Sequence, residues 1–201
     1  MSNTIALILA AGNSSRLGSP KQLLPYKGTT LLNNLIEEIY KSKVSGLYVV
    51  LGALKEQILP TLPSEIEKLE SITNPGWSSG MGSSIKVGVN YILKCNPLVN
   101  SIIITVSDQP FVTASVFNSL MNKAISEPAK SIVACQYGKD MYGVPVLFKK
   151  ELFNELLSIE DNTGAKQLIR ENKPITTFVK FPEGAIDIDT EDDLHKILPE
   201  M

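Results

Sequence analysis

The sequence predicts a single α/β domain built on a mixed, mainly parallel sheet. The continuous apolar run at residues 5–10 is typical of a strand that is covered on both faces, and residues 102–106 form the clearest strand pattern of the chain. Helical patterns alternate with such runs over about the first 125 residues, as crossovers between parallel strands require. The 201 residues contain no linker, repeat or low-complexity tract, so residues 1–201 are expected to form one domain.

The expected strands are short apolar segments that follow one another along the chain. After the first run, residues 47–51 form a second strand that ends at Gly52, and a shorter one surrounds Ile72. The second half of the chain is less regular, which indicates an antiparallel addition to the sheet. Its expected strands are residues 131–136, 176–181 and 185–188.

The expected helices carry apolar side chains three or four residues apart. Leucine and isoleucine recur at this spacing between residues 31 and 39, and Thr29 or Thr30 suits the N-cap. Thr113 is expected to cap the helix that follows it. The remaining expected helices are residues 54–59, 83–93, 114–124, 149–157, 164–171 and 191–198.

Composition argues against several classes of function. A formal net charge of -2 gives no basic surface for a nucleic-acid backbone, so no nucleic-acid partner is expected. The apolar run at residues 5–11 is too short for a signal peptide or a membrane span, which predicts a cytoplasmic protein without membrane contact. Cys95 and Cys135 lack metal-ligand spacing and are expected to be buried, reduced thiols.

Small residues follow the first strand, and two cations stand close behind them. In open α/β sheets, ligands bind beyond the carboxyl ends of the strands. Backbone N–H groups at Ala10, Ala11 and Gly12 can approach a phosphate chain closely, while Arg16 and Lys21 supply positive charge. The spacing fits neither a Walker A loop nor a dinucleotide fingerprint. The segment therefore predicts a polyanion site, and the alternative is a surface connection with solvated cations.

Acidic side chains follow two later strands. Asp108 leaves the end of the 102–106 strand, where a buried carboxylate needs a partner such as a divalent cation. Asp187 and Asp189 point the same way if their segment is extended. We expect Asp108 to hold Mg²⁺ together with Asp189 or, alternatively, Asp187. The competing interpretations are an Asx turn at Asp108 and a helix cap at Asp189.

Several blocks of the sequence resemble the MobA-like nucleotidyltransferases. The block "LAAGNSSRLGSPKQLLP" resembles the signature of that family, and "VSDQPFVT" is similar to its D-Q-P block. Further blocks resemble the molybdenum cofactor cytidylyltransferases of this family: "NPGWSSGMGSSIKVGV", "YGVPVLF", "EDNTGAKQLI" and "DIDTEDDL". These blocks lie in order from residue 9 to residue 194, so the resemblance covers nearly the whole chain.

The resemblance implies a Rossmann-like, three-layer domain and a specific group transfer. CMP would pass from CTP to the terminal phosphate of molybdopterin (molybdenum) cofactor, with Mg²⁺ and release of pyrophosphate. Ala11 favours CTP, because related enzymes that use GTP commonly have glycine at this position. A molybdenum hydroxylase is a candidate partner that would receive the modified cofactor.

The expected site residues fall into catalytic, nucleotide-binding and acceptor-binding groups. Arg16, Lys21 and Asp108 are expected to be catalytic, by neutralising phosphate charge and holding Mg²⁺. The expected nucleotide-binding residues are Leu9, Ala10, Ala11, Gly12, Arg16, Lys21, Gly80, Gly82, Ser83 and Ser84. The expected acceptor-binding residues are Gln109, Gly143, Pro145, Asp161 and Gly164. Residues 79–84 equally suit a plain helix start, and Trp77 is expected to anchor its loop rather than stack on a ligand.

Departures from the family pattern concern the acceptor more than the nucleotide. Asn162 and Thr163 stand where the family usually has Gly-Asp, and Tyr142 stands where arginine is often found. One alternative is therefore a nucleotidyltransferase for a sugar or alditol phosphate. Another is a non-catalytic chaperone that passes molybdenum cofactor to a molybdenum hydroxylase. The presence of Lys21 and Asp108 favours an enzyme, since a carrier needs no triphosphate clamp.

Overall fold

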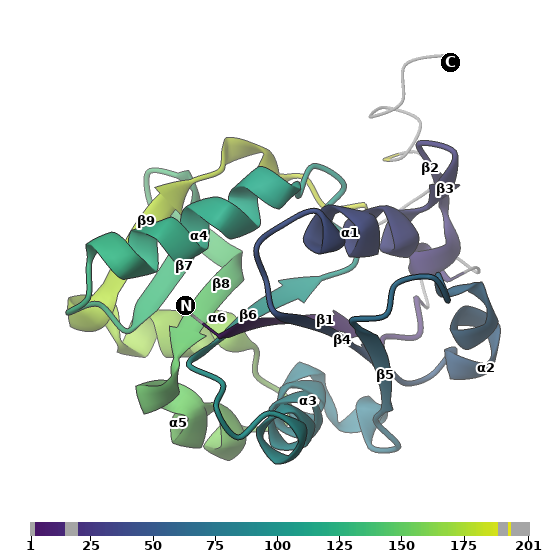
Figure 1. Ribbon diagram of the computed structural model, residues 1–201, viewed down its shortest axis with the longest axis horizontal. Helices are drawn as coiled ribbons and strands as arrows, with labels where there is room; N and C mark the ends of the chain where they lie inside the picture. The colour runs from purple at the N-terminus through teal and green to yellow at the C-terminus, as the bar shows by residue number, and fades with distance from the viewer. Residues whose placement is uncertain (1–2, 15–19, 189–192, 194–201) are drawn as a thin grey trace.

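The computed structural model describes residues 3–14, 20–188 and 193 and contains a seven-stranded sheet with helices on both faces (Figure 1). The strands are β1 (Thr4–Ala10), β4 (Gly46–Leu51), β5 (Leu69–Thr73), β6 (Ser101–Val106), β7 (Ile132–Gly138), β8 (Met141–Lys149) and β9 (Thr176–Lys180). Their order across the sheet is β5-β4-β1-β6-β8-β7-β9. Only β8 runs antiparallel to its neighbours, β6 and β7, within this sheet. The predicted mixed, mainly parallel sheet is confirmed.

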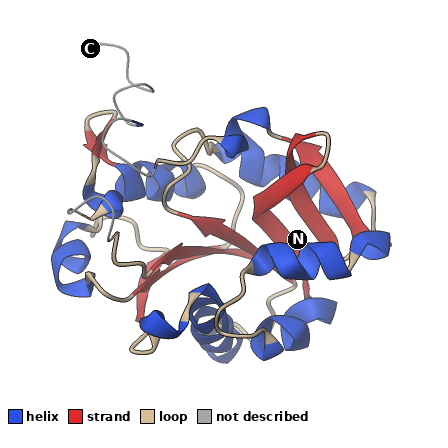
Figure 2. Cartoon of the chain, turned by 180° about the vertical axis from the view of Figure 1, so that it is seen from behind, coloured by secondary structure: helices blue, strands red, loops and turns tan. Residues whose placement is uncertain are grey.

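Two hydrophobic cores lie on opposite faces of this sheet. Within residues 3–14 and 20–188, the α-helices are α1 (Leu31–Tyr40), α2 (Lys55–Ile58), α3 (Met81–Cys95), α4 (Ala114–Ser126), α5 (Phe153–Ser158) and α6 (Ala165–Glu171). Successive side chains of a strand point to opposite faces, so Ile5 and Leu7 pack with α3, α5 and α6. Ala6 and Ile8 pack with α1, α2 and α4 on the other face. The sheet therefore lies between two helical layers, as predicted (Figure 2).

Short elements connect these layers. Thr30 is the N-cap of α1, and its Oγ1 accepts a hydrogen bond from the Asn33 N–H at 3.1 Å, so one of the two predicted caps is confirmed. The connecting elements include a hairpin of β2 (Pro25–Tyr26) and β3 (Thr29–Thr30), and the 3-10 helices η1 (Lys21–Leu23), η3 (Trp77–Ser79) and η6 (Pro182–Ala185). Among the described residues, no helix combines the length and apolar character needed to cross a membrane.

Strand β8, which lies inside the sheet between β6 and β7, was not predicted from the sequence. Gly143 and Pro145 interrupt the segment, and both residues are unusual inside a central strand. The structure accommodates them because the register between β7 and β8 shifts near Cys135 and again near Gly138. The antiparallel addition expected in the second half of the chain is this strand.

The strand expected at residues 185–188 is wrong. The chain there leaves the 3-10 helix η6, which has proline in its first turn, and the following residues form no ladder with the sheet. The Ile186 N–H donates to the Glu183 carbonyl at 3.1 Å instead. The helix expected at residues 191–198 falls almost entirely outside the described residues.

Only one of the two cysteines matches the predicted buried thiol. Cys135 lies fully buried in β7, and burial raises the pKa of its thiol to about 12. Cys95 ends α3 and is exposed, so the expectation that it is buried is wrong. The thiolate is the reactive form of cysteine, so the two thiols should differ in reactivity.

We expect iodoacetamide to modify Cys95 in the native protein and to leave Cys135 unmodified, because the Cys135 thiol is both inaccessible and protonated at pH 8. Mass spectrometry after native labelling should find one modified cysteine. Labelling in guanidinium chloride should modify both. Rapid native labelling of Cys135 would contradict the burial of β7.

Candidate active site

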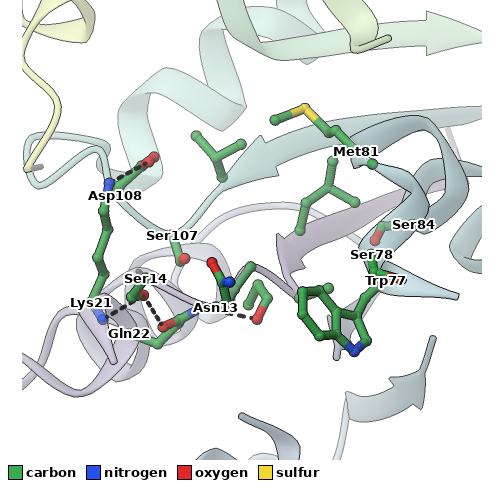
Figure 3. Close-up of a pocket in the computed structure, with 16 residues that line it drawn as sticks. Asn13, Ser14, Lys21, Gln22, Trp77, Ser78, Met81, Ser84, Ser107 and Asp108 are labelled. Carbon is green, nitrogen blue, oxygen red and sulfur yellow. Dashed lines mark hydrogen bonds and ion pairs between the residues drawn. The ribbon is translucent and has the colours of Figure 1, made fainter. Parts of the chain in front are cut away.

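The segments that follow β1 and β6 open onto one cavity of about 390 Å³ at the carboxyl ends of these strands (Figure 3). The two strands pair in parallel as far as Leu9 and Val106, so their ends meet at the same edge of the sheet. The segments that the sequence assigns to phosphate and metal therefore lie side by side. The cavity is lined by Leu9, Ala10, Ala11, Gly12, Asn13, Ser14, Lys21, Gln22, Trp77, Ser78, Gly80, Met81, Ser84, Val106, Ser107 and Asp108.

Lys21 and Asp108 face each other at one end of this cavity (Figure 3). The Lys21 Nζ lies 3.7 Å from the Asp108 Oδ2, and the two side chains are 14% and 30% exposed. A partly exposed pair of this kind contributes on the order of 1 kcal/mol or less to stability. Its importance is chemical, because a cation and a carboxylate at one end of a cavity can engage a phosphate group and a metal ion together.

Gln22 is a site residue that the sequence analysis did not identify. It is buried behind the loop that follows β1, and its Nε2 donates to the carbonyl oxygens of Ala10 at 3.0 Å and Gly12 at 3.3 Å. The Ser14 hydroxyl donates to the Gln22 Oε1 at 3.3 Å and accepts from the Lys21 N–H at 2.9 Å. No local signal marks such a glutamine, since glutamine in a loop is ordinarily an exposed polar residue.

The opposite end of the cavity is formed by η3 and the start of α3. Trp77 is partly buried; it packs against one of the cores and also lines the cavity, so it anchors its loop as predicted and contributes aromatic surface as well. Gly80 and Ser84 line the cavity too. Gly82 and Ser83 lie behind this wall, where the Ser83 hydroxyl donates to the Gly80 carbonyl at 2.7 Å. Their predicted contact with the nucleotide stays a prediction.

Two glycines allow residues 160–163 to approach the back of the same wall. A Cβ added at Gly82 would collide with the carbonyl oxygen of Glu160, and one added at Gly80 would collide with that of Asp161. Gly80 also has a φ of 128°, which side chains other than glycine rarely adopt. The Gly82 N–H donates to the Asp161 carbonyl at 2.9 Å, so a backbone hydrogen bond joins the start of α3 to residues 160–163.

The change Gly82→Ala is expected to lower the free energy of unfolding by about 1–3 kcal/mol, because its methyl group must displace the backbone at Glu160. Urea denaturation measures the loss. The matched control is Gly138→Ala, whose Cβ would lie no closer than 3.8 Å to Met141. Equal stability of the two variants would show that the two segments are not in contact.

Asp187 lies close to Asp108 in the structure. The Ile188 N–H donates to the backbone oxygen of Asp108 at 2.9 Å, which ties the segment after η6 to the turn after β6. Burial raises the pKa of Tyr137, and the negative charges of Asp187 and Asp108 raise it further. The two carboxylates therefore lie within electrostatic reach of one side chain.

The carboxylate of Asp108 fits a magnesium ion that also binds substrate. Mg²⁺ commonly takes one or two protein carboxylates and completes its shell with phosphate oxygens and water. Within residues 3–14, 20–188 and 193, no three potential metal-ligating side chains gather. A bound triphosphate would therefore supply the remaining ligands. Arg16 and Asp189, which the sequence assigns to phosphate and metal, lie outside the described residues.

Three of the predicted acceptor-binding residues, Gln109, Gly143 and Pro145, are not among the residues that line the cavity. Gln109 is buried, and its amide donates to the Gly184 carbonyl at 2.8 Å. Gly143 and Pro145 both belong to β8, and a Cβ at Gly143 would lie 2.8 Å from the Tyr137 hydroxyl. In the structure these residues hold β8 and η6 beside the turn after β6, and their contact with an acceptor stays a prediction.

The other two, Asp161 and Gly164, flank the segment behind the cavity wall. Asp161 forms an ion pair with Lys86 at 2.6 Å. Gly164 is the N-cap of α6, and a Cβ there would lie 3.0 Å from the sulfur of Met81, which lines the cavity. The segment therefore lies one side chain away from the cavity, and its predicted role toward the acceptor stays a prediction.

Comparison with known proteins identifies the family. The profile of the MobA-like NTP transferase domain matches residues 6–175. The chain belongs to the MobA-like NTP transferase family. The resemblance predicted from the sequence is thereby confirmed.

Relatives of similar length carry different activities in their names. The nicotine blue oxidoreductase of Paenarthrobacter nicotinovorans is 26% identical over 201 residues and is matched over 96% of this chain and 95% of its own. The molybdenum cofactor cytidylyltransferase of Escherichia coli K12 is 25% identical over 198 residues, covering 96% of this chain and 94% of its own.

A similar solved structure is that of Rv0371c from Mycobacterium tuberculosis H37Rv, with a TM-score of 0.81, 25% identity and full coverage of both chains. A structure of Rv0371c in complex with manganese also matches over both full chains, with a TM-score of 0.78 and 23% identity. These matches agree with the Rossmann-like α/β fold described above.

Proposed function

We propose that this MobA-like nucleotidyltransferase transfers CMP from CTP to the terminal phosphate of molybdenum cofactor and releases pyrophosphate. The observation that carries the proposal is the meeting of Lys21, Asp108 and the small residues after β1 at one cavity. Support for the base and the acceptor comes from the relative named molybdenum cofactor cytidylyltransferase.

The reaction needs no nucleophile from the protein. An oxygen of the acceptor phosphate attacks the α-phosphorus of CTP, the bond from that phosphorus to the bridging oxygen breaks, and pyrophosphate leaves. Catalysis then consists of positioning the two phosphates and neutralising the charge that concentrates between them. The Lys21 ammonium would bind the α-phosphate, while the backbone at residues 10–12 and Arg16 would hold the β- and γ-phosphates.

Asp108 is the residue that would hold Mg²⁺, together with Asp187 or Asp189. A bound Mg²⁺ would neutralise charge on the triphosphate and the leaving pyrophosphate. The manganese complex of Rv0371c supports a divalent metal ion in this fold. With a metal ion held by Asp108, Lys21 and that ion would together supply positive charge to the reacting phosphates.

The far end of the cavity would receive the cytosine base. Ser78, Gly80 and Ser84 line it with small polar groups, and Trp77 adds an aromatic surface. Hydroxyl and backbone groups can bond the edge of a base, and an aromatic ring can pack against its face. The cavity would thus bind the base beside Trp77 and Ser84, and the phosphates at the opposite end beside Lys21 and Asp108 (Figure 3).

The proposal is tested by measuring pyrophosphate release with each of the four nucleoside triphosphates and Mg²⁺, with and without molybdenum cofactor. Release with CTP and the cofactor together, and with neither alone, is the expected result. Release with a sugar or alditol phosphate instead would identify a different acceptor. Tight binding of the cofactor without pyrophosphate release from any triphosphate would identify a carrier. Hydride transfer from NADH without pyrophosphate release would overturn the proposal in favour of an oxidoreductase.

A further inference from the structure

The Gln22 side chain continues the hydrogen-bond ladder of β1 beyond the point where β6 ends. Successive carbonyl groups of an extended chain turn to opposite sides. The Ala11 carbonyl accepts from the Ala53 N–H at 3.1 Å, on the side of β4. The carbonyls of Ala10 and Gly12 both accept from the Gln22 Nε2, at 3.0 and 3.3 Å. A single buried amide thus replaces the strand partner that β6 no longer provides after Val106.

The other atom of the same amide is tied to Lys21 through Ser14. The Ser14 hydroxyl donates to the Gln22 Oε1 at 3.3 Å and accepts from the Lys21 N–H at 2.9 Å. Ser14 has a φ of 51°, a left-handed conformation that is uncommon for serine. The two hydrogen bonds of its hydroxyl group hold Ser14 in this conformation. Gln22 therefore contacts the Ala10 carbonyl directly and the Lys21 N–H through Ser14.

This linkage fixes groups that face the cavity. The peptide bond is planar, so a carbonyl that points at Gln22 turns the N–H of the next residue to the opposite side. Holding the Gly12 carbonyl therefore fixes the direction of the N–H of Asn13, which lines the cavity. Lys21 directly precedes Gln22 in the chain, so the same contacts fix where its side chain begins.

We infer that Gln22 is a positioning residue for the triphosphate, which holds residues 10–14 and Lys21 in the arrangement that binds the phosphate chain. This inference rests on the proposed nucleotidyltransferase function. Gln22 lines the cavity but is only 3% exposed, and it acts through the groups to which it hydrogen-bonds, so it need not touch the substrate itself. A loop that is already ordered loses less conformational entropy when its ligand binds. Loss of the Gln22 hydrogen bonds should therefore lower the affinity for the triphosphate.

The test compares CTP and CMP, both with Mg²⁺, in binding to the wild-type protein and to Gln22→Met. Methionine nearly conserves the volume and removes all three hydrogen bonds. We expect the dissociation constant for CTP to rise about tenfold or more, which corresponds to the net contribution of one or more of the lost hydrogen bonds. The dissociation constant for CMP should rise clearly less. Trp77 is the only tryptophan in the chain and lines the cavity, so its fluorescence reports both titrations.

Thr30→Ala is the control for an effect that comes only from a general loss of stability. This change removes the hydrogen bond from the Asn33 N–H at the start of α1 and leaves the cavity lining intact. Its CTP affinity should equal that of the wild type. If Gln22→Met does not fold, Gln22→Asn serves as the second variant, since its side chain is one methylene shorter and cannot reach the same partners; it should also bind CTP more weakly.

The outcomes separate the two proposals. Wild-type binding of CTP combined with unchanged CTP affinity in the Gln22 variants overturns the positioning role alone. Equal weakening of CTP and CMP also overturns it, because the role concerns the phosphate chain. Failure of the wild-type protein to bind any nucleoside triphosphate overturns the proposed function and the positioning role with it.

Discussion

Replacing Asp108 with asparagine is expected to lower kcat by about a hundredfold or more, since the loss of one charge contact with the reacting phosphates commonly costs about 3 kcal/mol of barrier. The amide keeps the size of the side chain and removes the negative charge that would hold Mg²⁺. The measurement is pyrophosphate release at saturating CTP, with Mg²⁺ and molybdenum cofactor present.

The matched control for this change is Asp140→Asn in the exposed turn between β7 and β8. It removes the same charge from the same residue type and should leave kcat unchanged. Near-normal turnover by Asp108→Asn would contradict the assignment of Asp108 to the metal. A similar loss in both variants would show that the effect reflects overall charge rather than the cavity.

Replacing Lys21 with alanine is the second change with a large expected effect. The ammonium group lies 3.7 Å from the Asp108 carboxylate, and in the proposed reaction it would neutralise charge on the α-phosphate. We expect kcat/KM for CTP to fall by about a hundredfold. Thermal stability should change little, because the ion pair with Asp108 is partly exposed.

Lys123→Ala provides the control for the lysine change. Lys123 forms an ion pair with Glu127 at 2.6 Å on α4, outside the cavity lining. Its kinetic constants should match those of the wild type. Unimpaired kcat/KM in Lys21→Ala would mean that the triphosphate binds elsewhere, whereas a large loss of stability would mean that the residue acts mainly in folding.

The core of the site could be predicted because the fold class itself brings its parts together. Parallel strands present their carboxyl ends at one edge, so the small residues after β1 and the aspartate after β6 had to meet if the two strands were neighbours. Apolar side chains dominate β1 and β6, which made both strands and their ends easy to identify.

Features that depend on contacts between distant segments could not be predicted in this way. Gln22 acts through carbonyl groups ten and twelve positions away, and nothing in its neighbourhood indicates that it is buried. The contact of Gly82 with residues 160–163 joins two segments far apart in the sequence. Strand β8 was missed because Gly143 and Pro145 contradict local strand preferences, which the sheet overrides through shifts in register.

A crystal structure with CTP and Mg²⁺ tests the central claim most directly. The account predicts a triphosphate beside Gly12 and Lys21, a metal ion on Asp108, and the base near Trp77 and Ser84. A triphosphate bound elsewhere, or bound in this cavity with its metal ion away from Asp108, would contradict it.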